Sequence, residues 1–263
     1  MPVLDPDPIY FRESLESVLG QTLERIEVIV VEDPSMRTAR DVIESLKDPR
    51  IRYYANRERT SGVQQRNLGL AEARAEFVAI QDADDIAEKD RLEKQLDFLR
   101  THPTVGVLGT QIQVIDAKGK HLGYRCYPQE NDAIVHAMQM FNPIAHPTVM
   151  FRKQTILTAG GYQYLTHTTE DYELWSRLAL REVRFANHPE VLLRYRVHVE
   201  GTKTRKLHDT IRGTLDIKRM YWLGTMDLKA KARMYGEYLL LWLPASFVLG
   251  LFLRTQLSRK YPC

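Results

Sequence analysis

The stretch that decides the fold is Phe77-Val78-Ala79-Ile80-Gln81-Asp82-Ala83-Asp84-Asp85. Its apolar first half is typical of a buried strand, and an acidic cluster begins directly after it. The carboxylates of Asp82, Asp84 and Asp85 would repel one another in a site without water. A hard divalent cation such as Mg²⁺ or Mn²⁺, which prefers oxygen ligands, would neutralise their charge. Because side chains alternate along an extended chain, Asp82 and Asp84 share one side, where they suit a metal together with a ribose or diphosphate. The alternative is an acidic turn that caps the next helix.

Around this stretch, strand-like and helix-like apolar periods alternate up to about residue 110. The β-branched run Ile26–Val31 is nearly continuous in apolar residues, as in a buried parallel strand. Strands are expected at 26–31, 51–54 and 77–80, and helices around 9–19, 38–46, 62–74 and 88–100. The alternation predicts an α/β fold, with a parallel sheet flanked by helices.

Polar residues follow the other expected strands as well, and ligands of such sheets gather at the carboxyl ends of the strands. Asp33 follows the strand at 26–31, where a carboxylate can accept a hydrogen bond from a base N–H or a ribose hydroxyl. Gly62 allows close backbone approach, while Arg66 and Asn67 stand near a helix start that suits a phosphate or ribose. Alternatively, Asp33 is only a turn residue before Pro34, and Arg66 is only an arginine on the solvated surface.

The second half of the chain is less regular. A strand is expected at 105–115, a turn at 117–120 into an antiparallel partner, a helix at 171–180 and a strand at 191–197. Residues 201–263 are expected to form a helical, basic and hydrophobic extension. Within it, residues 238–253 carry no charge and have basic flanks, but a membrane span needs about 20 apolar residues. This pattern suits a helix in an anionic membrane interface, or one packed on its own domain or a second subunit.

Composition narrows the class of protein. The chain has 263 residues, of which 44% are hydrophobic and 27% charged, so it is neither disordered nor collagen-like. A net charge of +3 gives no basis for binding nucleic acid through overall charge. Two cysteines, Cys126 and Cys263, are too few for a disulfide framework or a multi-thiolate zinc site, which favours a reducing compartment.

Taken together, the ordered motifs resemble the inverting family-2 glycosyltransferases, which have the GT-A fold of the nucleotide-diphospho-sugar transferases. The resemblance covers roughly residues 1–198. It is carried by the segments 14–22, 30–35, 62–70, 80–85, 91–95, 142–152, 160–162, 169–178 and 193–198.

The resemblance implies a role for individual residues. Asp171 is similar to the general base of the family, although it also suits the start of a helix. Mn²⁺ or Mg²⁺ is implied at Asp84 and Asp85, with His198 as a further ligand or as a structural histidine. Residues implied to bind the nucleotide-sugar donor are Asp33, Arg66, Asp82 and Asp84.

The resemblance also implies a GT-A domain over 1–200 and a metal-dependent, inverting transfer from a donor, expected to be UDP-linked. The acceptor would be a saccharide or lipid-linked hydroxyl in polysaccharide, glycolipid or envelope glycan synthesis. A cytoplasmic enzyme is expected, with peripheral membrane contact through 232–263. Met1-Pro2-Val3-Leu4 resembles only the end of the family's first strand, so an upstream start is expected. The alternatives are a non-catalytic nucleotide-sugar-binding or scaffold protein and, less well matched, a nucleotidyltransferase.

Overall fold

Strands and helices alternate through the first hundred residues, as the sequence predicts. The structure, a computed structural model, describes residues 1–163, 169–198, 207–255 and 257–261. The strands are β1 (Pro2–Val3), β2 (Val28–Glu32), β3 (Ile51–Ala55), β4 (Phe77–Ala79), β5 (Ile86–Ala87), β6 (Val105–Ile115), β7 (His121–Arg125), β8 (Met150–Arg152) and β9 (Arg184–Arg196). The helices are α1 (Pro8–Leu19), α2 (Arg40–Leu46), α3 (Gly62–Glu72), α4 (Arg91–Thr101), α5 (Asn131–Met138), α6 (Lys153–Thr158), α7 (Glu170–Ala179), α9 (Leu207–Ile217), α10 (Leu228–Leu239) and α11 (Ala245–Thr255).

The described strands form two sheets. β1, β2 and β3 make a parallel sheet in that order, and β4, β8, β6, β9 and β5 make a second, with β7 beside β6. In the second sheet β6 runs parallel to β9 and antiparallel to β7 and β8. The α/β class predicted from the sequence is therefore confirmed, and the antiparallel partner expected after the turn at 117–120 is β7.

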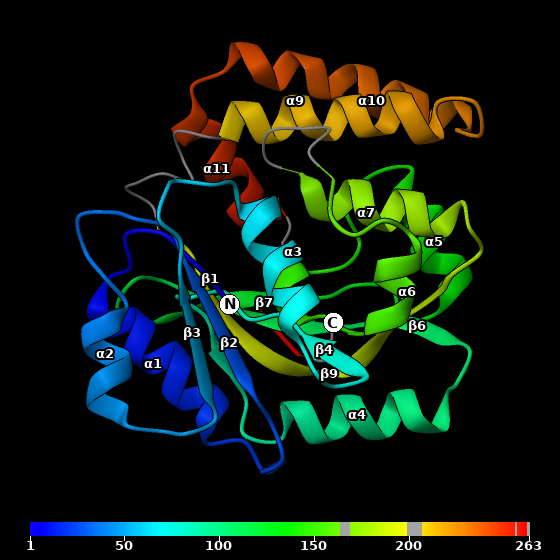
Figure 1. The fold of residues 1–263 in the computed structure, drawn as a ribbon. Coiled ribbons are helices and arrows are strands. Elements are labelled where there is room, and N and C mark those ends of the chain that lie inside the picture. The colour runs from blue at the N-terminus through cyan, green and yellow to red at the C-terminus, as the bar shows by residue number, and fades with distance from the viewer. Residues whose placement is uncertain (164–168, 199–206, 256, 262–263) are drawn as a thin grey trace.

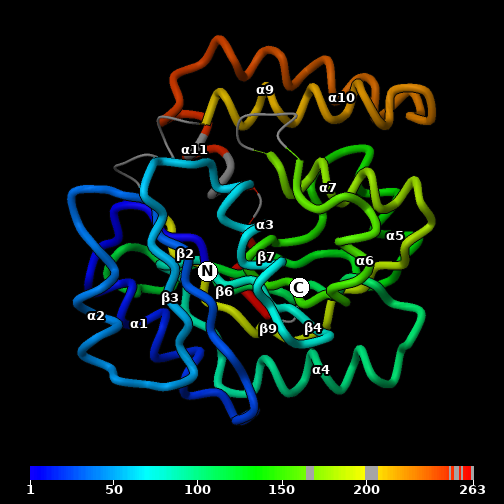
Figure 2. The backbone as a smooth tube through the Cα atoms, in the orientation of Figure 1, coloured from blue at the N-terminus to red at the C-terminus, as the bar shows by residue number. Residues whose placement is uncertain are grey.

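Helices cover both faces of the sheets (Figure 1; Figure 2). α4 lies on one face, where Leu92 and Leu99 pack against Leu108 of β6 and Met150 of β8. α3, α5, α6 and α7 cover the other face, and Trp175 of α7 is fully buried in the main core. Because apolar side chains are buried on both faces, the strands read as almost continuous hydrophobic runs in the sequence.

The C-terminal helices pack on this core. α9 and α10 lie side by side beyond α7 (Figure 1), and Leu215, Trp222 and Met234 join the same apolar cluster as Trp175. The expected helical extension is present, while its predicted boundary at residue 200 falls outside the described residues and stays a prediction. None of the described helices has both the length and the apolarity needed to cross a membrane.

The structure contains several short elements and a disulfide bond that the sequence does not predict. The short elements α5, β8 and α6 lie in a region whose apolar residues follow no clear period, so they were not predicted. Cys126 is disulfide-bonded. The cysteine count therefore gives no support to a reducing compartment, which stays a prediction.

Candidate active site

Asp84 and His198, which lie far apart in the sequence, meet at the end of β4. His198 follows β9, and its Nε2 lies 2.9 Å from Oδ2 of Asp84. Both side chains are about a quarter exposed, so a ligand can reach them. The pairing of β9 with β5 and β6 brings His198 to this position, which gives the pair predicted from the sequence a structural basis.

Asp85 lies behind this pair, in the protein interior. Its side chain is fully buried, and its Oδ1 accepts a hydrogen bond of 2.8 Å from the backbone N–H of Arg196. The guanidinium of Arg196 is also buried; it donates to the backbone carbonyl of Asp84 at 2.9 Å and pairs with Glu13 at 2.6 Å. Asp85 thus braces β9 against the acidic turn, and the geometry favours Asp84 over Asp85 for contact with a ligand.

A second buried arginine supports the acidic turn from below. Arg91 of α4 donates to Oε1 of Gln81 and to the carbonyl oxygen of Ile80, both at 2.8 Å. Burial lowers the pKa of the Arg91 guanidinium to about 10, which leaves it protonated at neutral pH. Arg91 and Arg196 supply positive charge beside the acidic turn, for which the sequence predicts a divalent cation. The acidic cluster by itself therefore does not require a metal.

Asp33 lies at the end of β2, where the sequence places it, and is 2% exposed. Its oxygens accept hydrogen bonds from Nδ2 of Asn56 at 2.7 Å, the backbone N–H of Thr60 at 2.8 Å and Oγ1 of Thr60 at 2.8 Å. The neighbouring Glu32 points toward α2, where it accepts from the backbone N–H of Ala39 at 2.7 Å. A ligand at this strand end would meet a carboxylate already fixed in orientation.

Arg66 of α3 links the first half of the chain to α7. Its Nη1 lies 2.6 Å from Oε1 of Glu170, and both side chains are mostly buried. Burial alone would lower the pKa of the Arg66 guanidinium, but the Glu170 and Asp82 carboxylates hold it above its ordinary value. Among the described residues, nothing accepts a hydrogen bond from the buried Nε of Arg66. A buried cation with a donor to spare suits an anionic group such as a phosphate.

Asp171 follows Glu170 in the first turn of α7. Its Oδ2 accepts a hydrogen bond of 2.7 Å from Nδ2 of Asn142. Burial and the adjacent Glu170 carboxylate raise the pKa of Asp171 to about 6. A helix start alone favours the charged form of an acid, so the raised pKa indicates an environment shaped by more than a structural cap. A carboxylate with this pKa is suited to accept a proton near neutral pH.

A neutral histidine and a tyrosine close the site beside Arg66. Nε2 of His146 lies 2.9 Å from the Tyr162 hydroxyl. Burial, with Arg66 nearby, lowers the pKa of His146 well below its ordinary value, so the ring stays uncharged. Asn67 holds the Tyr162 backbone through two hydrogen bonds of 2.9 Å, and Gly161 takes a positive φ of 69° to permit this contact. The segments 160–162 and 66–67, separate in the sequence, therefore form one structural unit.

Asp84 and His198 are the candidate ligands for a divalent cation. No cluster of three or more His, Cys, Asp or Glu side chains suited to a metal occurs in the described parts of the chain. The pair offers one oxygen and one nitrogen ligand, and Mg²⁺ is commonly held by one or two carboxylates with substrate phosphates completing the shell. The residues fit a cation that binds together with a diphosphate.

Acidic side chains at strand ends, a buried arginine beside them and a carboxylate suited to accept a proton are the features that the resemblance to the GT-A glycosyltransferases implies. Residues 8–157 match the family described as Glycosyl transferase family 2. The chain belongs to this family, which rules out the nucleotidyltransferase alternative and favours an enzyme over a scaffold protein.

Two relatives illustrate the similarity in sequence. The amylovoran biosynthesis glycosyltransferase AmsE of Erwinia amylovora is 31% identical over 221 residues, covering 81% of this chain and 80% of AmsE. The UDP-Gal:alpha-D-GlcNAc-diphosphoundecaprenol beta-1,3-galactosyltransferase of Escherichia coli is 27% identical over 205 residues, covering 75% of this chain and 72% of that enzyme. The chain is a glycosyltransferase, and these relatives support a role in polysaccharide synthesis.

Two solved structures share the fold. S. aureus TarS 1-349 in complex with UDP-GlcNAc has a TM-score of 0.63 at 17% identity, covering 90% of this chain and 70% of TarS 1-349. The mannosyltransferase PcManGT from Pyrobaculum calidifontis, in complex with GDP-Man and Mn²⁺, has a TM-score of 0.63 at 16% identity, covering 95% of this chain and 77% of PcManGT. At this identity the likeness concerns the fold alone.

Proposed function

We propose that the protein transfers a sugar from a UDP-linked donor to a hydroxyl acceptor, with inversion at the anomeric carbon and with a divalent cation. The observation that carries this proposal is the position of Arg66. It pairs with Glu170 and interacts electrostatically with both Asp82 and Asp171, so the acidic turn after β4 and the start of α7 belong to one site. Under this proposal, the acidic turn that binds the donor and the base Asp171 lie on either side of Arg66 in the same site.

In the proposed reaction, Asp171 accepts the proton of the acceptor hydroxyl as that oxygen attacks the anomeric carbon. Asn142 holds the Asp171 carboxylate in place through its 2.7 Å hydrogen bond. Arg66 stabilises the charge that develops on the leaving diphosphate, since its guanidinium is buried and protonated. Attack from the side opposite the leaving group inverts the anomeric centre in one displacement, and no covalent intermediate is needed.

The remaining site residues orient the donor. Asp33 contacts the base and Asp82 the ribose or the diphosphate, each at a strand end. Asp84 and His198 would hold Mn²⁺ or Mg²⁺, which would supply positive charge opposite the leaving group. Asp85 contributes by fixing β9 against the acidic turn rather than by direct coordination, because its side chain has no exposed surface.

A UDP-linked donor and a lipid-linked acceptor are supported by the relatives. The E. coli galactosyltransferase is named for a UDP-linked sugar and a diphosphoundecaprenol acceptor, and the TarS structure holds UDP-GlcNAc. The P. calidifontis mannosyltransferase, with GDP-Man and Mn²⁺, makes GDP the competing nucleotide. We assign the acceptor to polysaccharide or envelope glycan synthesis at the cytoplasmic face of a membrane.

Calorimetric titration with UDP, GDP and dTDP, each with and without Mn²⁺, tests the donor site. UDP binding that needs Mn²⁺ and is lost in Asp84→Asn is the expected result. Asp97→Asn is the matched control, because Asp97 is exposed on α4 away from the site. Equal binding by wild type and Asp84→Asn would refute the metal role, and tighter binding of GDP would reassign the donor.

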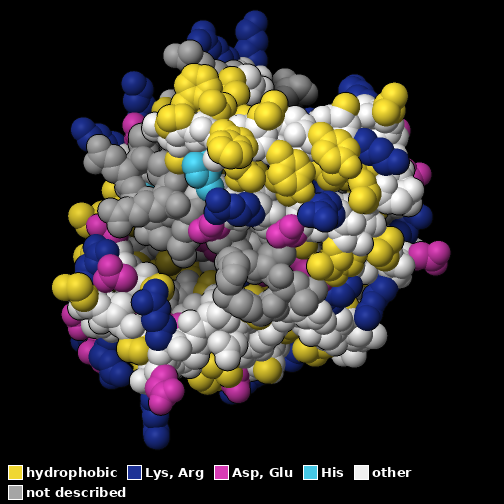
Figure 3. Space-filling model, turned by 90° about the horizontal axis from the view of Figure 1, so that it is seen from above, with side chains coloured by type: hydrophobic (Ala, Val, Ile, Leu, Met, Phe, Trp, Pro, Cys, Tyr) yellow, Lys and Arg dark blue, Asp and Glu magenta, His cyan; other side chains and the backbone are white. Residues whose placement is uncertain are grey.

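The outer face of α10 supports peripheral membrane contact. α10 buries Ala230 and Met234 in the core, yet carries a second apolar stripe that faces solvent. On α10 this stripe is Leu228, Ala232, Tyr235 and Leu239, and it continues to Trp242 in the short helical turn that follows α10. Trp242 is 88% exposed and Leu228 83% exposed. Figure 3 shows hydrophobic side chains gathered with Lys and Arg on the face formed by the C-terminal helices.

Charge indicates which partner this stripe fits. Lys229 and Arg233 are exposed one position after Leu228 and Ala232, so a basic row runs beside the apolar one. An apolar stripe with basic neighbours suits the interface of an anionic membrane. The protein is expected to co-sediment with vesicles that contain phosphatidylglycerol and to bind pure phosphatidylcholine weakly.

The vesicle assay uses substitutions rather than a deletion, because Met234 and Ala230 belong to the core. The double variant Leu239→Ser, Trp242→Ser should lose most of the bound fraction. The control Met36→Ser, Leu180→Ser removes two exposed apolar side chains elsewhere and should bind like wild type. Unchanged binding by the double variant would refute the membrane assignment.

A further inference from the structure

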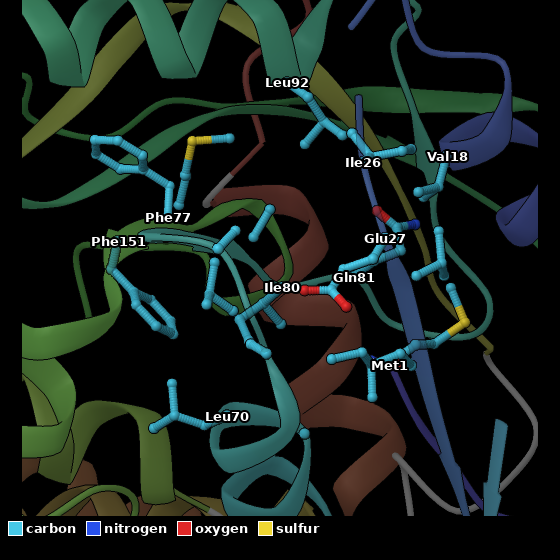
Figure 4. Close-up of a pocket in the computed structure, with 18 of the residues that line it drawn as sticks. Met1, Val18, Ile26, Glu27, Leu70, Phe77, Ile80, Gln81, Leu92 and Phe151 are labelled. Carbon is cyan, nitrogen blue, oxygen red and sulfur yellow. The ribbon is translucent and has the colours of Figure 1, made fainter. Parts of the chain in front are cut away.

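Arg66 has a long side chain beside an open space. It borders a cavity of about 840 Å³, and Figure 4 shows Leu70, Ile80 and Phe151 in the apolar part of the cavity wall. An apolar wall offers no hydrogen-bond acceptor, and an empty space provides no packing contacts on that side. Among the described residues, the hydrogen-bond partner of the guanidinium is Glu170, at 2.6 Å. The orientation of Arg66 therefore depends on its other neighbours.

Gly62 leaves room for this guanidinium. Both residues lie in α3, four positions apart, and helical side chains point back toward the N-terminus, so Arg66 extends over Gly62. A Cβ at position 62 would lie 3.0 Å from Nη1 of Arg66, which is too close for an ordinary contact. The capping box of Ser61 and Gln64 fixes the start of α3 and with it the backbone of Gly62. The close approach that the sequence predicts at Gly62 is made by this guanidinium.

The ring of Tyr162 is a second neighbour of the guanidinium. Cζ of Arg66 lies 5.9 Å from the centroid of the ring, within the range of a cation–π interaction. The tyrosine is fixed at both ends. Asn67 holds its backbone through two hydrogen bonds of 2.9 Å, and Nε2 of His146 lies 2.9 Å from its hydroxyl oxygen. Because Tyr162 and His146 are both buried, the ring offers Arg66 a fixed surface.

A guanidinium that is ordered in advance favours the binding of an anion. An arginine that becomes ordered only when its ligand arrives loses side-chain entropy at that moment, and the affinity falls accordingly. Gly62, Tyr162 and the Glu170 carboxylate order Arg66 in the free protein. The position matters as well, because a displacement of about 1 Å in an active site can cost about 100-fold in rate.

We propose that Gly62, Tyr162 and His146 are positioning residues that hold the Arg66 guanidinium where it meets the diphosphate of the donor. Gly62 acts through the absence of a side chain, Tyr162 through its ring, and His146 through its contact with the Tyr162 hydroxyl. The inference rests on the proposed function, in which Arg66 stabilises the leaving diphosphate. Substitutions at these positions should therefore weaken binding of the diphosphate and spare binding of the nucleoside.

The test measures the affinities for UDP and for uridine, both in the presence of Mn²⁺, by calorimetry and NMR titration. Uridine lacks the phosphates, so the ratio of the two affinities reports the phosphate contacts. Gly62→Ala should reduce this ratio about five- to tenfold, because the guanidinium has to move by a few tenths of an ångström. The melting temperature should stay the same or rise, since φ of Gly62 is not positive and alanine favours a helix.

Two variants test the tyrosine. Tyr162→Leu removes the ring and should reduce the affinity ratio about tenfold. Tyr162→Phe keeps the ring but loses the contact with His146, and should reduce the ratio about two- to threefold. The matched control is Gly69→Ala in the same helix, whose new Cβ would lie 3.9 Å from a methyl group of Val31, an ordinary contact. This control should keep the wild-type ratio.

A double-mutant cycle shows whether Gly62 acts through Arg66. In an Arg66→Ala background, adding Gly62→Ala should leave the affinity ratio unchanged, because the guanidinium that the new methyl group displaces is absent. An equal effect of Gly62→Ala with and without Arg66 would overturn the proposal. Since Gly62→Ala is compatible with the helix, this test stands even if Tyr162→Leu fails to fold.

Two further results would also overturn the proposal. One is a wild-type ratio in Gly62→Ala. The other is an equal loss of UDP and uridine binding in that variant, because it would reflect damage to the whole site rather than a displaced guanidinium. Failure of the proposed function gives a different result: the wild-type protein itself would then bind UDP no better than uridine, and the positioning role would fall with it.

Discussion

Asp171→Asn tests whether the raised pKa of this residue serves the reaction. As general base, the carboxylate is expected to contribute about 10²–10⁴-fold to the rate, so the substitution should reduce sugar transfer by that factor. Asparagine keeps the shape and still accepts a hydrogen bond from Asn142. Loss of activity would then reflect loss of the base rather than loss of structure.

The same pKa fixes the expected pH dependence. With a pKa of about 6, Asp171 is about one-tenth ionised at pH 5 and nine-tenths at pH 7, so kcat/KM of the wild type should rise about tenfold across this interval. Glu170→Gln removes a charge that raises the pKa of Asp171 and should move the rise to lower pH. A rise centred near 4, or one that Glu170→Gln leaves in place, would contradict the assignment.

As the pH rises, the free energy of unfolding should decrease while the transfer activity increases. The folded-state pKa of Asp171 is raised from 3.8 to about 6, so the folded protein loses stability as the pH rises from about 4 to 6 and keeps this penalty above 6. A pKa difference of about two between the folded and the unfolded state corresponds to about 3 kcal/mol of free energy of unfolding. Solvent screening at a half-buried side chain reduces this contribution to about 1–2 kcal/mol. Asp171→Asn should recover this energy at pH 7, raising the melting temperature by about 2–6 °C.

The control is Asp132→Asn, which removes an exposed carboxylate from the first turn of α5 and should change neither transfer nor melting temperature appreciably. Transfer is measured with radiolabelled donor, and unfolding by calorimetry at pH 5 and pH 7. An Asp171→Asn variant that melts lower at pH 7 would identify a structural acid. A variant that keeps transfer within tenfold of wild type would refute the base.

Three further predictions concern the fold around the site. Gly161→Ala should destabilise the protein by more than about 1 kcal/mol, because φ is 69° and the new Cβ would lie 2.7 Å from Oδ1 of Asn67; chemical denaturation measures this. His198→Ala should weaken Mn²⁺-dependent UDP binding about tenfold while leaving the melting temperature within 2 °C, as calorimetry would detect. Phe151 is fully buried in the main core, so Phe151→Ala should cost about 3–5 kcal/mol in the same denaturation assay.

The sequence predicted most of the regular elements, because apolar period and β-branching are local properties. Strand β2 and helix α4 lie within a few residues of the expected ranges. By contrast, β8 has three residues and α6 has six, and segments this short contain too few positions to establish a period. Their places are set by contacts with distant strands, which no local pattern records.

In the candidate site, too, some residues are predictable from the local sequence and others depend on distant contacts. Asp33, Asp82 and Asp84 could be found from the sequence because each follows an apolar strand. Arg196 could not, since its role depends on β9 crossing behind residues more than 100 positions earlier. Arg91 was recognised only as part of a helix, although its buried guanidinium donates to the carbonyl oxygen of Ile80, directly before the acidic turn.

These two arginines change how the acidic turn should be understood. Their charges are permanent and buried, so they hold the turn together whether or not a cation is present. The cation proposed at Asp84 and His198 would then be expected to enter with the donor and to leave with the nucleotide, rather than to hold the fold together. A metal that served as a structural counter-ion would instead be needed for stability. The half-buried Asp84–His198 pair, beside a fully buried Asp85, fits the first arrangement.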